Sequence, residues 1–372
     1  MGKQYSSLEG VVMDNNFWFG KTVLITGHTG FKGGWLSLWL QSLGAKVVGY
    51  SLEPPTTPSL FEVASVADGM VSILGDVRDY DHLREVIEKH GPSIIFNMAA
   101  QPLVRYSYEN AIETYSTNVM GTVNLLEAVR HSNGAKAVVN VTSDKCYENK
   151  EWVWGYREDE AMGGYDPYSS SKGCAELVTS AYRSSYFSSD GVSSNQSTFI
   201  ATARAGNVIG GGDWAEDRLI PDVITSFIKG KPVVIRSPNS VRPWQHVLEP
   251  LYGYMRLAEK LSNDGEKFAR GWNFGPHDED AATVSRVVER LASIWGDGAI
   301  WEIDGDNNPH EARYLKLDCS LARTHIEWSP CWRLDEGLEN TVEWFRVYES
   351  GVNMRDFTLN QIKKYQCAAI QN

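Results

Sequence analysis

Short apolar runs rich in β-branched residues alternate along the chain with segments of helical periodicity. The apolar runs are Thr22–Thr26, Lys46–Tyr50, Met70–Leu74, Ser93–Met98, Ala137–Val141 and Thr198–Ala203. The helical segments between them are Gly33–Leu43, Asp79–His90, Glu109–His131 and Pro167–Phe187. Continuous apolar strands that alternate with helices are typical of a parallel sheet covered on both faces. The pattern therefore predicts an α/β protein with a doubly wound parallel sheet.

Beyond about Arg204 the alternation loosens into Gly-rich and Pro-rich segments with short mixed elements. The 372 residues of the chain also exceed the ~250–300 that a single hydrophobic core usually serves. We therefore expect residues 17–205 to form one domain, with a contribution from 242–275. Residues 206–241 and 276–365 should form a smaller, partly interleaved C-terminal α/β domain.

Composition limits the kinds of partner that the protein can have. The formal net charge of −12 argues against nucleic acid, because binding a phosphate backbone needs clustered Lys and Arg. The five cysteines are scattered with no C-x-x-C pair, so we expect neither a disulfide framework nor a metal site. No apolar run approaches the ~18 residues of a membrane span. These features are those of a cytoplasmic protein.

The turn after the first apolar run has a G-x-x-G-x-x-G spacing, Thr26-Gly27-His28-Thr29-Gly30-Phe31-Lys32-Gly33. Between a strand and a helix, such glycines permit a tight turn, close approach to a pyrophosphate and close helix–strand packing. The helix N-terminus then presents N–H groups to the phosphates. The turn therefore predicts a Rossmann-type dinucleotide site. The residues expected to contact the cofactor here are Gly27, His28, Gly30, Phe31, Lys32 and Gly33.

The third apolar run leads into Asp76-Val77, which we expect beside the adenine, where a carboxylate can accept the exocyclic amine. The alternative is that Asp76 caps a helix over Arg78–His90. The second run ends in Tyr50-Ser51-Leu52-Glu53, with no acidic residue directly at its end for a ribose hydroxyl and no Arg for a 2′-phosphate. This pattern favours NAD over NADP.

Tyr168 and Lys172 are four residues apart, and so share one face of the helix that begins near Pro167. A nearby cation favours the phenolate and should lower the pKa of Tyr168, so that it can take a proton from a hydroxyl. A Tyr-x-x-x-Lys pair alone is more often a solvated helix face. Here it follows a strand that ends in Thr142-Ser143, whose hydroxyls can hold a substrate oxygen against the tyrosine.

Together, the glycine turn, Asn97-Met98-Ala99-Ala100, Asn118, Ser143, Tyr168 and Lys172 resemble the extended short-chain dehydrogenase/reductases. The resemblance covers roughly residues 17–365, and it implies that Ala99, Ala100, Asn118, Thr142, Tyr168 and Lys172 also contact NAD. Within that superfamily, Thr142-Ser143-Asp144-Lys145-Cys146-Tyr147 resembles the nucleotide-sugar 4,6-dehydratases. The Asp144-Lys145 pair and the segment 100–105 resemble the branch whose substrate is CDP-glucose, since the dTDP-glucose branch has Glu in place of Lys145.

This resemblance implies a lyase reaction in three stages. C4 of the sugar is oxidised by hydride transfer to NAD, water leaves from C5 and C6, and the hydride returns to C6. In this scheme Tyr168 is the base at C4, Lys172 its electrostatic partner and ribose anchor, and Ser143 positions the hydroxyl. Asp144 is the acid at C6 and Lys145 the base at C5. A solvated or ion-paired lysine is the alternative for Lys145.

The smaller domain should bind the nucleotide-diphosphate sugar, which the resemblance identifies as CDP-glucose. The residues that the resemblance assigns to the substrate are Gln101, Ser143, Asn207, Arg242, Asn273 and Arg313. The two arginines can clamp a diphosphate, although an ion pair or a turn role is as plausible for each. The family also implies a homodimer or a dimer of dimers, and a role in deoxysugar and lipopolysaccharide O-antigen synthesis. The competing hypotheses are a dehydratase of another nucleotide sugar, a 4-epimerase, and a catalytically silent NAD-binding regulator.

Overall fold

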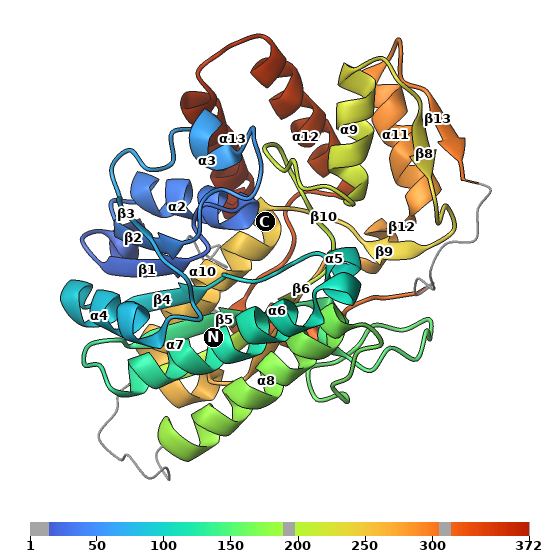
Figure 1. Ribbon diagram of the computed structural model, residues 1–372. Helices are drawn as coiled ribbons and strands as arrows, with labels where there is room; N and C mark the ends of the chain where they lie inside the picture. The colour runs from blue at the N-terminus through green and yellow to red at the C-terminus, as the bar shows by residue number, and fades with distance from the viewer. Residues whose placement is uncertain (1–14, 189–197, 305–313, 372) are drawn as a thin grey trace, which may run out of the picture.

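The computed structural model describes residues 15–188, 198–304 and 314–371, and its centre is a seven-stranded sheet of order β11-β6-β5-β4-β1-β2-β3 (Figure 1). All neighbouring strands of this sheet run parallel. The strands are β1 Thr22–Thr26, β2 Lys46–Ser51, β3 Val71–Leu74, β4 Ile94–Asn97, β5 Ala137–Val141, β6 Phe199–Ala205 and β11 Gly271–Phe274. The predicted α/β class and doubly wound parallel sheet are confirmed.

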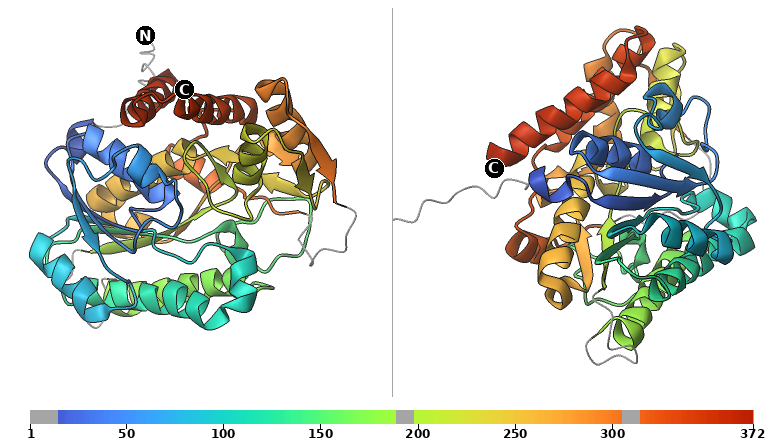
Figure 2. Two further views of the ribbon diagram at one scale, coloured as in Figure 1. Left: turned by 45° about the horizontal axis from the view of Figure 1, so that its top comes forward. Right: turned by 90° about the vertical axis from the view of Figure 1, so that its left-hand side faces the viewer.

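Two hydrophobic cores lie on the two faces of this sheet, because successive side chains of a strand point to opposite faces. In β1, Val23 and Ile25 belong to the larger core, whereas Leu24 belongs to the smaller one. The helices on the larger core are α2 Phe31–Ser42 and α10 Leu248–Asp264, and those on the smaller core are α4 Tyr80–His90, α7 Gly121–Arg130 and α8 Pro167–Tyr186. Figure 2 shows α7 and α8 together on one side of the molecule. The sheet is therefore buried on both faces.

The helix expected over Glu109–His131 is divided into shorter elements. Helix α5 Val104–Glu109 ends at Asn110, whose backbone leaves the helical region, and α6 Ala111–Tyr115 follows. A π-helical turn, Ser116–Met120, then leads into α7. The wider turn lies where the Asn118 side chain enters the interior and bonds to Gln101 and Ser171. Such π-helical turns are rare in proteins, and sequence periodicity does not reveal them.

Short elements from residues 208–303 pair outside the central sheet, two strands at a time. The pairs are β7 Val208–Ile209 with β10 Gln245–His246, β8 Val233–Ile235 with β13 Trp301–Ile303, and β9 Val241–Pro243 with β12 Ala281–Thr283. The other helices are α1 Asn15–Trp18, α3 Leu60–Val63, α9 Leu219–Ile228, α11 Val284–Trp295, α12 Leu334–Glu349 and α13 Met354–Gln371. Short 3₁₀ turns cover Asp144–Cys146, Gly265–Phe268 and Asp278–Asp280, and a second π-helical turn covers Ala322–Ile326.

Strand β11 lies at the edge of the central sheet, and α10 packs against β5 and β6. The division of the chain into two domains stays a prediction. Across the described ranges, no helix has both the length and the apolar character that crossing a membrane requires.

Candidate active site

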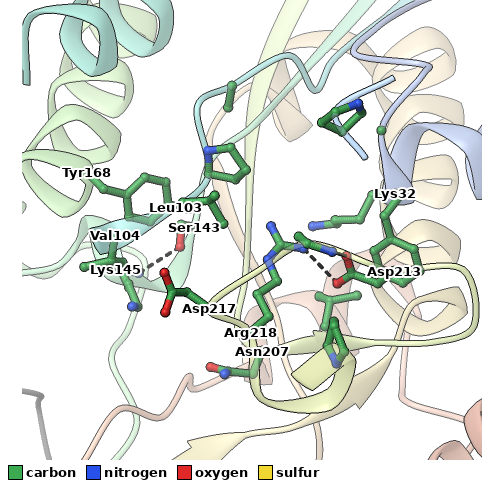
Figure 3. Close-up of a pocket in the computed structure, with 18 of the residues that line it drawn as sticks. Lys32, Leu103, Val104, Ser143, Lys145, Tyr168, Asn207, Asp213, Asp217 and Arg218 are labelled. Carbon is green, nitrogen blue, oxygen red and sulfur yellow. Dashed lines mark hydrogen bonds and ion pairs between the residues drawn. The ribbon is translucent and has the colours of Figure 1, made fainter. Parts of the chain in front are cut away.

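A cleft of about 2100 Å³ lies at the carboxyl ends of the central strands. One wall comes from the glycine turn after β1 and the ends of β4 and β5, with the start of α8. The facing wall comes from residues 205–222 and 233–237 of the outer elements. Figure 3 shows Tyr168, Ser143 and Lys145 on one side of this cleft and Lys32 on the other. Ligands of doubly wound folds bind at this end of the strands.

The glycine turn is too compact for side chains at its first and third glycines. Gly27 has a φ of +76°, and a Cβ there would lie 2.8 Å from the backbone nitrogen of Ala99. A Cβ on Gly33 would lie 2.1 Å from the carbonyl oxygen of Gly27. Gly30 is the N-cap of α2 and has no side chain with which to cap it. The first N–H groups of α2 therefore face the cleft as a phosphate cradle.

His28 belongs to this turn, but the structure does not place it on the cleft wall, contrary to the expected contact with the cofactor. The ring is fully buried behind the turn, where Nε2 shares a hydrogen bond of 2.8 Å with the Ser72 hydroxyl. It packs directly over Gly49, where a Cβ would lie 2.2 Å from the ring. Burial lowers the pKa of His28 to about 4. His28 is therefore a neutral residue that supports the turn.

Asp76 and Val77 line the cleft, as expected for the adenine end. The Asp76 carboxylate is bonded to the Arg78 guanidinium at 2.8 Å and to the Arg78 backbone N–H. These hydrogen bonds lower its pKa. The alternative role of Asp76 as a helix cap is wrong, because α4 begins later and its N-cap is Asp79, which accepts from the His82 N–H.

Ser143, Tyr168 and Lys172 all line the cleft. Asp166 caps α8 through the Ser169 N–H, and Pro167 follows at the first helical position, so Tyr168 stands in the first turn. Burial raises the pKa of Tyr168 to about 12, although a hydrogen bond with Ser143 lowers it. The expected lowering of the Tyr168 pKa below its ordinary value is therefore wrong for this structure.

The pKa of Tyr168 is not lowered, because burial disfavours the charged forms of both Tyr168 and Lys172. Burial lowers the pKa of Lys172 to about 8, and its ammonium donates to the Val141 carbonyl at 3.4 Å. The charges that act on Tyr168 come instead from Asp144 and Asp166, which raise its pKa, and from Arg218, which lowers it. Desolvation thus outweighs the nearby cations.

Asp144 is 3% exposed and lies at the floor of the cleft. Its Oδ1 accepts from the Ser143 hydroxyl at 3.0 Å, whereas its buried Oδ2 has no partner among the described residues. Burial raises the pKa of this carboxyl, against the opposing charges of Lys145 and Arg242. The arrangement favours a protonated acid on the cleft wall. Lys145 is partly buried on the same wall, and its backbone N–H donates to the Ser143 hydroxyl at 3.2 Å.

Ala99, Ala100 and Thr142 line the cleft as expected, whereas Asn118 and Gln101 do not. The Asn118 side-chain oxygen accepts a hydrogen bond from the Gln101 backbone N–H. Its Nδ2 donates to the Gln101 carbonyl oxygen and to the Ser171 hydroxyl. The Gln101 side chain is turned away toward Thr114. These hydrogen bonds fix the loop that follows β4. The expected contacts of Asn118 with the cofactor and of Gln101 with the substrate stay predictions.

Asn273 is also absent from the cleft wall, although a contact with the substrate was expected. It is fully buried at the end of β11, where its Oδ1 accepts from the Tyr147 hydroxyl at 2.7 Å. Its Nδ2 donates to the carbonyl oxygens of Tyr156 and Asp318. With both amide atoms engaged, Asn273 joins three segments behind the site.

Asn207 and Arg242 line the cleft, as expected for substrate-binding residues, and Arg313 lies outside the described residues. Sequence reasoning missed Arg218, which also lines the cleft and is paired with Asp213 at 2.9 Å. The available signal was the run Gly210-Gly211-Gly212-Asp213 soon after the sixth strand, since the loops at carboxyl ends carry ligand groups. In the described part of the chain, no group of His, Cys, Asp and Glu is arranged to hold a metal ion.

A buried polar cluster lies directly behind this wall. The Glu176 carboxylate on α8 accepts from the Thr142 and Thr202 hydroxyls and from the Arg204 guanidinium, the last at 2.7 Å. Burial alone would raise the pKa of Glu176, but the Arg204 charge and these hydrogen bonds lower it on balance. The cluster connects α8, which carries Tyr168, to β5 and β6.

The fold and the site define a class: Rossmann-type dinucleotide-binding proteins with Ser, Tyr and Lys side chains on the cleft at the carboxyl ends of the strands. A family model described as GDP-mannose 4,6 dehydratase matches residues 24–341. The chain belongs to this family.

Curated relatives at high and at low sequence identity are both nucleotide-sugar 4,6-dehydratases. The chain is 57% identical to a CDP-glucose 4,6-dehydratase of Salmonella typhimurium, over 96% of this chain and 99% of that one. It is 25% identical to a dTDP-glucose 4,6-dehydratase of Xanthomonas campestris pv. campestris, over 89% of this chain and 95% of that one.

The solved structure of a dTDP-glucose 4,6-dehydratase from Streptomyces venezuelae, with NAD and TYD bound, superposes with a TM-score of 0.75. Its identity is 22%, and the match covers 89% of this chain and 98% of that one, so this likeness concerns the fold.

Proposed function

We propose that the protein catalyses the NAD-dependent 4,6-dehydration of CDP-D-glucose to CDP-4-dehydro-6-deoxy-D-glucose and water. The relative that is 57% identical over nearly the whole chain is a CDP-glucose 4,6-dehydratase. The observation that carries the dehydratase reaction is the buried, unpartnered Oδ2 of Asp144 beside Ser143. A group that must protonate a leaving hydroxyl needs a raised pKa and a place on the cleft wall, and Asp144 has both. A 4-epimerase loses no water and needs no such acid.

The residues on the cleft wall divide the reaction among them. When bound, NAD accepts the hydride from C4 and later returns it to C6. Ser143 orients the C4 hydroxyl, Tyr168 takes its proton, and Lys172 anchors the ribose of the cofactor. Asp144 gives a proton to the departing C6 hydroxyl. Lys145, on the same turn, removes the proton from C5, which the C4 ketone has made acidic.

A panel of nucleotide-linked glucoses tests the substrate and the reaction together. The protein and NAD are incubated with the CDP, dTDP, UDP and GDP forms, and the 4-keto-sugar is followed by its absorbance in alkali. CDP-glucose should give product without net NADH, because the hydride that leaves C4 returns to C6. Accumulation of NADH in proportion to product would identify a simple dehydrogenase instead, and a 4-epimer as product would identify an epimerase.

Lys145 as the C5 base requires its own test. In Lys145→Met, oxidation at C4 should proceed but elimination should stall, so NADH accumulates on the enzyme and turnover falls roughly 10²–10⁴-fold. The measurement is NADH absorbance together with deuterium at C5 of the sugar recovered from deuterated water. Lys89→Met, at an exposed position of α4, is the matched control and should behave as the unaltered protein. Normal turnover and deuterium incorporation in Lys145→Met would assign the base to another group.

A homodimer, or a dimer of dimers, is the oligomeric state that we propose. The surface formed by α6, the π-helical turn and α8 exposes apolar side chains: Ile112 is 88% exposed, Leu177 60% and Met120 50%. Apolar exposure of this kind marks interaction sites. A doubly substituted Ile112→Glu, Leu177→Glu protein should sediment as a smaller species than the unaltered chain. A monomer for the unaltered chain at working concentration would contradict the proposal. The cytoplasmic location stays a prediction.

A further inference from the structure

Lys32 occupies a position where a helix disfavours a positive charge. It is the second residue of α2, in a first turn that contains no acidic residue. Helix side chains lean back toward the helix N-terminus, and the Lys32 side chain lines the cleft (Figure 3). The N-terminal end of a helix dipole is positive and attracts anions. In the protein alone, the charge on Lys32 is therefore opposed by its own helix.

The groups that face Lys32 from the neighbouring elements add to this effect. Its ammonium donates to the Tyr254 hydroxyl on α10 at 3.2 Å, a neutral partner. The cations of Lys172 on α8 and Arg218 before α9 both disfavour the charge, and among the groups that act on it Asp144 alone favours it. Together with burial, the first cause, these charges lower the pKa of Lys32 to about 7. An anion bound here would reverse the balance.

We propose that Lys32 is a direct ligand of the pyrophosphate of the dinucleotide, and that it takes up a proton when the cofactor binds. The inference rests on the proposed function, because it assumes that the glycine turn holds NAD. A pyrophosphate held by the N–H groups of α2 would bring two negative charges to the end of the helix whose first turn carries Lys32. The backbone N–H groups carry only partial charges. A lysine, whose protonation depends on its surroundings, adds a full positive charge to them.

The direction of the pH dependence follows from the change in protonation. The pKa of Lys32 lies near 7 in the free protein and rises when an anion binds. Affinity for the dinucleotide is therefore fully present at pH values below about 7 and is lost as the pH rises through the pKa of the bound state. Lys172, with a pKa lowered to about 8, titrates in the same range. The phenols of Tyr168 and Tyr254 do not, because burial raises the pKa of both.

Comparing NAD with ADP-ribose isolates the contact, because ADP-ribose has the same pyrophosphate but lacks the positively charged nicotinamide. Binding of each is measured by calorimetry between about pH 6.5 and 9, a range that spans the lysine pKa values above, in two buffers of different ionisation enthalpy, so that proton uptake is counted. In Lys32→Met, both dissociation constants at pH 6.5 should rise about 10- to 100-fold, the loss of a charged hydrogen bond. The difference from the unaltered protein should shrink toward pH 9.

Two further variants complete the design. Lys32→Arg keeps its charge at every pH, so it should bind both ligands without the proton uptake that Lys32 contributes, even if Lys32→Met fails to fold. Lys46→Met, at an exposed position at the start of β2, should match the unaltered protein. Unchanged ADP-ribose affinity in Lys32→Met, with NAD equal or tighter, would place the ammonium beside the nicotinamide and overturn the inference. Failure of the unaltered protein to bind either ligand would overturn the cofactor assignment, and this inference with it.

Discussion

The two sides of the carboxyl end of β5 hold buried carboxyl groups in opposite electrostatic states. Behind the wall of the cleft, Glu176 receives hydrogen bonds from Thr142, Thr202 and Arg204, and its pKa is lowered. At the floor of the cleft, Asp144 is bonded to Ser143 by one oxygen and leaves the other without a partner among the described residues, and its pKa is raised. Both groups are removed from water, so burial alone does not decide their ionisation.

The difference shows that two consecutive residues serve different groups, one a structural cluster and the other the reactive carboxyl. The Thr142 hydroxyl bonds to Glu176 in the cluster behind the wall, whereas the Ser143 hydroxyl bonds to Asp144 in the cleft, because successive side chains of an extended segment point to opposite sides. A buried polar cluster with every group bonded is rigid and fixes the geometry around it. A buried group left partly unpaired is costly, and it is retained where a ligand completes it.

The largest effect should come from the cleft side. Tyr168→Phe removes the proton acceptor and nearly preserves shape, so the rate should fall ~10²–10⁴-fold, while the free energy of unfolding stays close to that of the unaltered protein. Ketosugar production and denaturant unfolding measure the two quantities. Tyr182→Phe, on the same helix with its hydroxyl on Glu127, should keep full activity. Near-normal activity in Tyr168→Phe would remove this residue from the mechanism.

The second effect should appear behind the wall, and in stability. Arg204→Met leaves the Glu176 carboxylate buried without its cation, which should reduce the free energy of unfolding by about 3–5 kcal/mol. Arg157→Met breaks an ion pair of 3.5 Å with Asp318 in which the arginine is 71% exposed, and such pairs contribute about 0–1 kcal/mol. Urea unfolding of the two variants compares them. Equal losses would show that the cluster does not depend on its charge pair.

A smaller effect, of opposite sign on the two sides, should come from replacing each carboxyl by its amide. Glu176→Gln loses charged hydrogen bonds and should destabilise the protein by about 1–3 kcal/mol. Asp144→Asn removes a carboxyl that resists ionisation, so the protein should be at least as stable as before, yet inactive in dehydration. Thermal unfolding and the ketosugar assay distinguish the two. A stability loss in Asp144→Asn as large as that in Glu176→Gln would mean that Asp144 is a structural group.

The smallest effect is the dependence of stability on pH. Glu176 has a lowered pKa, so its contribution is present above the ordinary Glu value of about 4.3 and is lost as the pH falls through the folded-state pKa. Asp144 has a raised pKa, so stability declines as the pH rises from the ordinary Asp value of about 3.9 through the folded-state pKa. Unfolding of Asp144→Asn across this range should lack that decline. A curve that parallels the unaltered protein would contradict the raised pKa.

Much of the fold could be predicted from the sequence, because in this class the alternation of apolar strands and helices along the chain determines the parallel sheet. All six apolar runs are strands of the central sheet, and their predicted ends differ from the observed ones by at most two residues. The seventh strand, Gly271–Phe274, is short and holds a buried Asn, so it is recognised as a strand only beside β6. The π-helical turn at Ser116–Met120 likewise depends on where Asn118 is buried.

The site was less predictable, because a motif specifies which residues are near a ligand but not where each side chain points. Ser143, Asp144, Lys145, Tyr168 and Lys172 meet at the cleft as expected. His28, Gln101, Asn118 and Asn273 belong to equally suggestive segments, yet their polar atoms bond to the protein behind the cleft. The raised pKa of Tyr168 depends on the depth of burial, which a spacing of four residues does not convey.

The place of β11 in the sheet has a consequence for synthesis of the chain on the ribosome. Strand β6 lies between β5 and β11 and is almost wholly buried, but its outer neighbour is made only after residues 271–274 have been translated. Until then β6 is an open, apolar edge, which is a template for pairing with other chains. A fragment that ends near residue 205 would contain the glycine turn, Ser143, Tyr168 and Lys172, and would still expose this edge. The part of the chain that carries the chemistry thus relies on a late strand to escape aggregation.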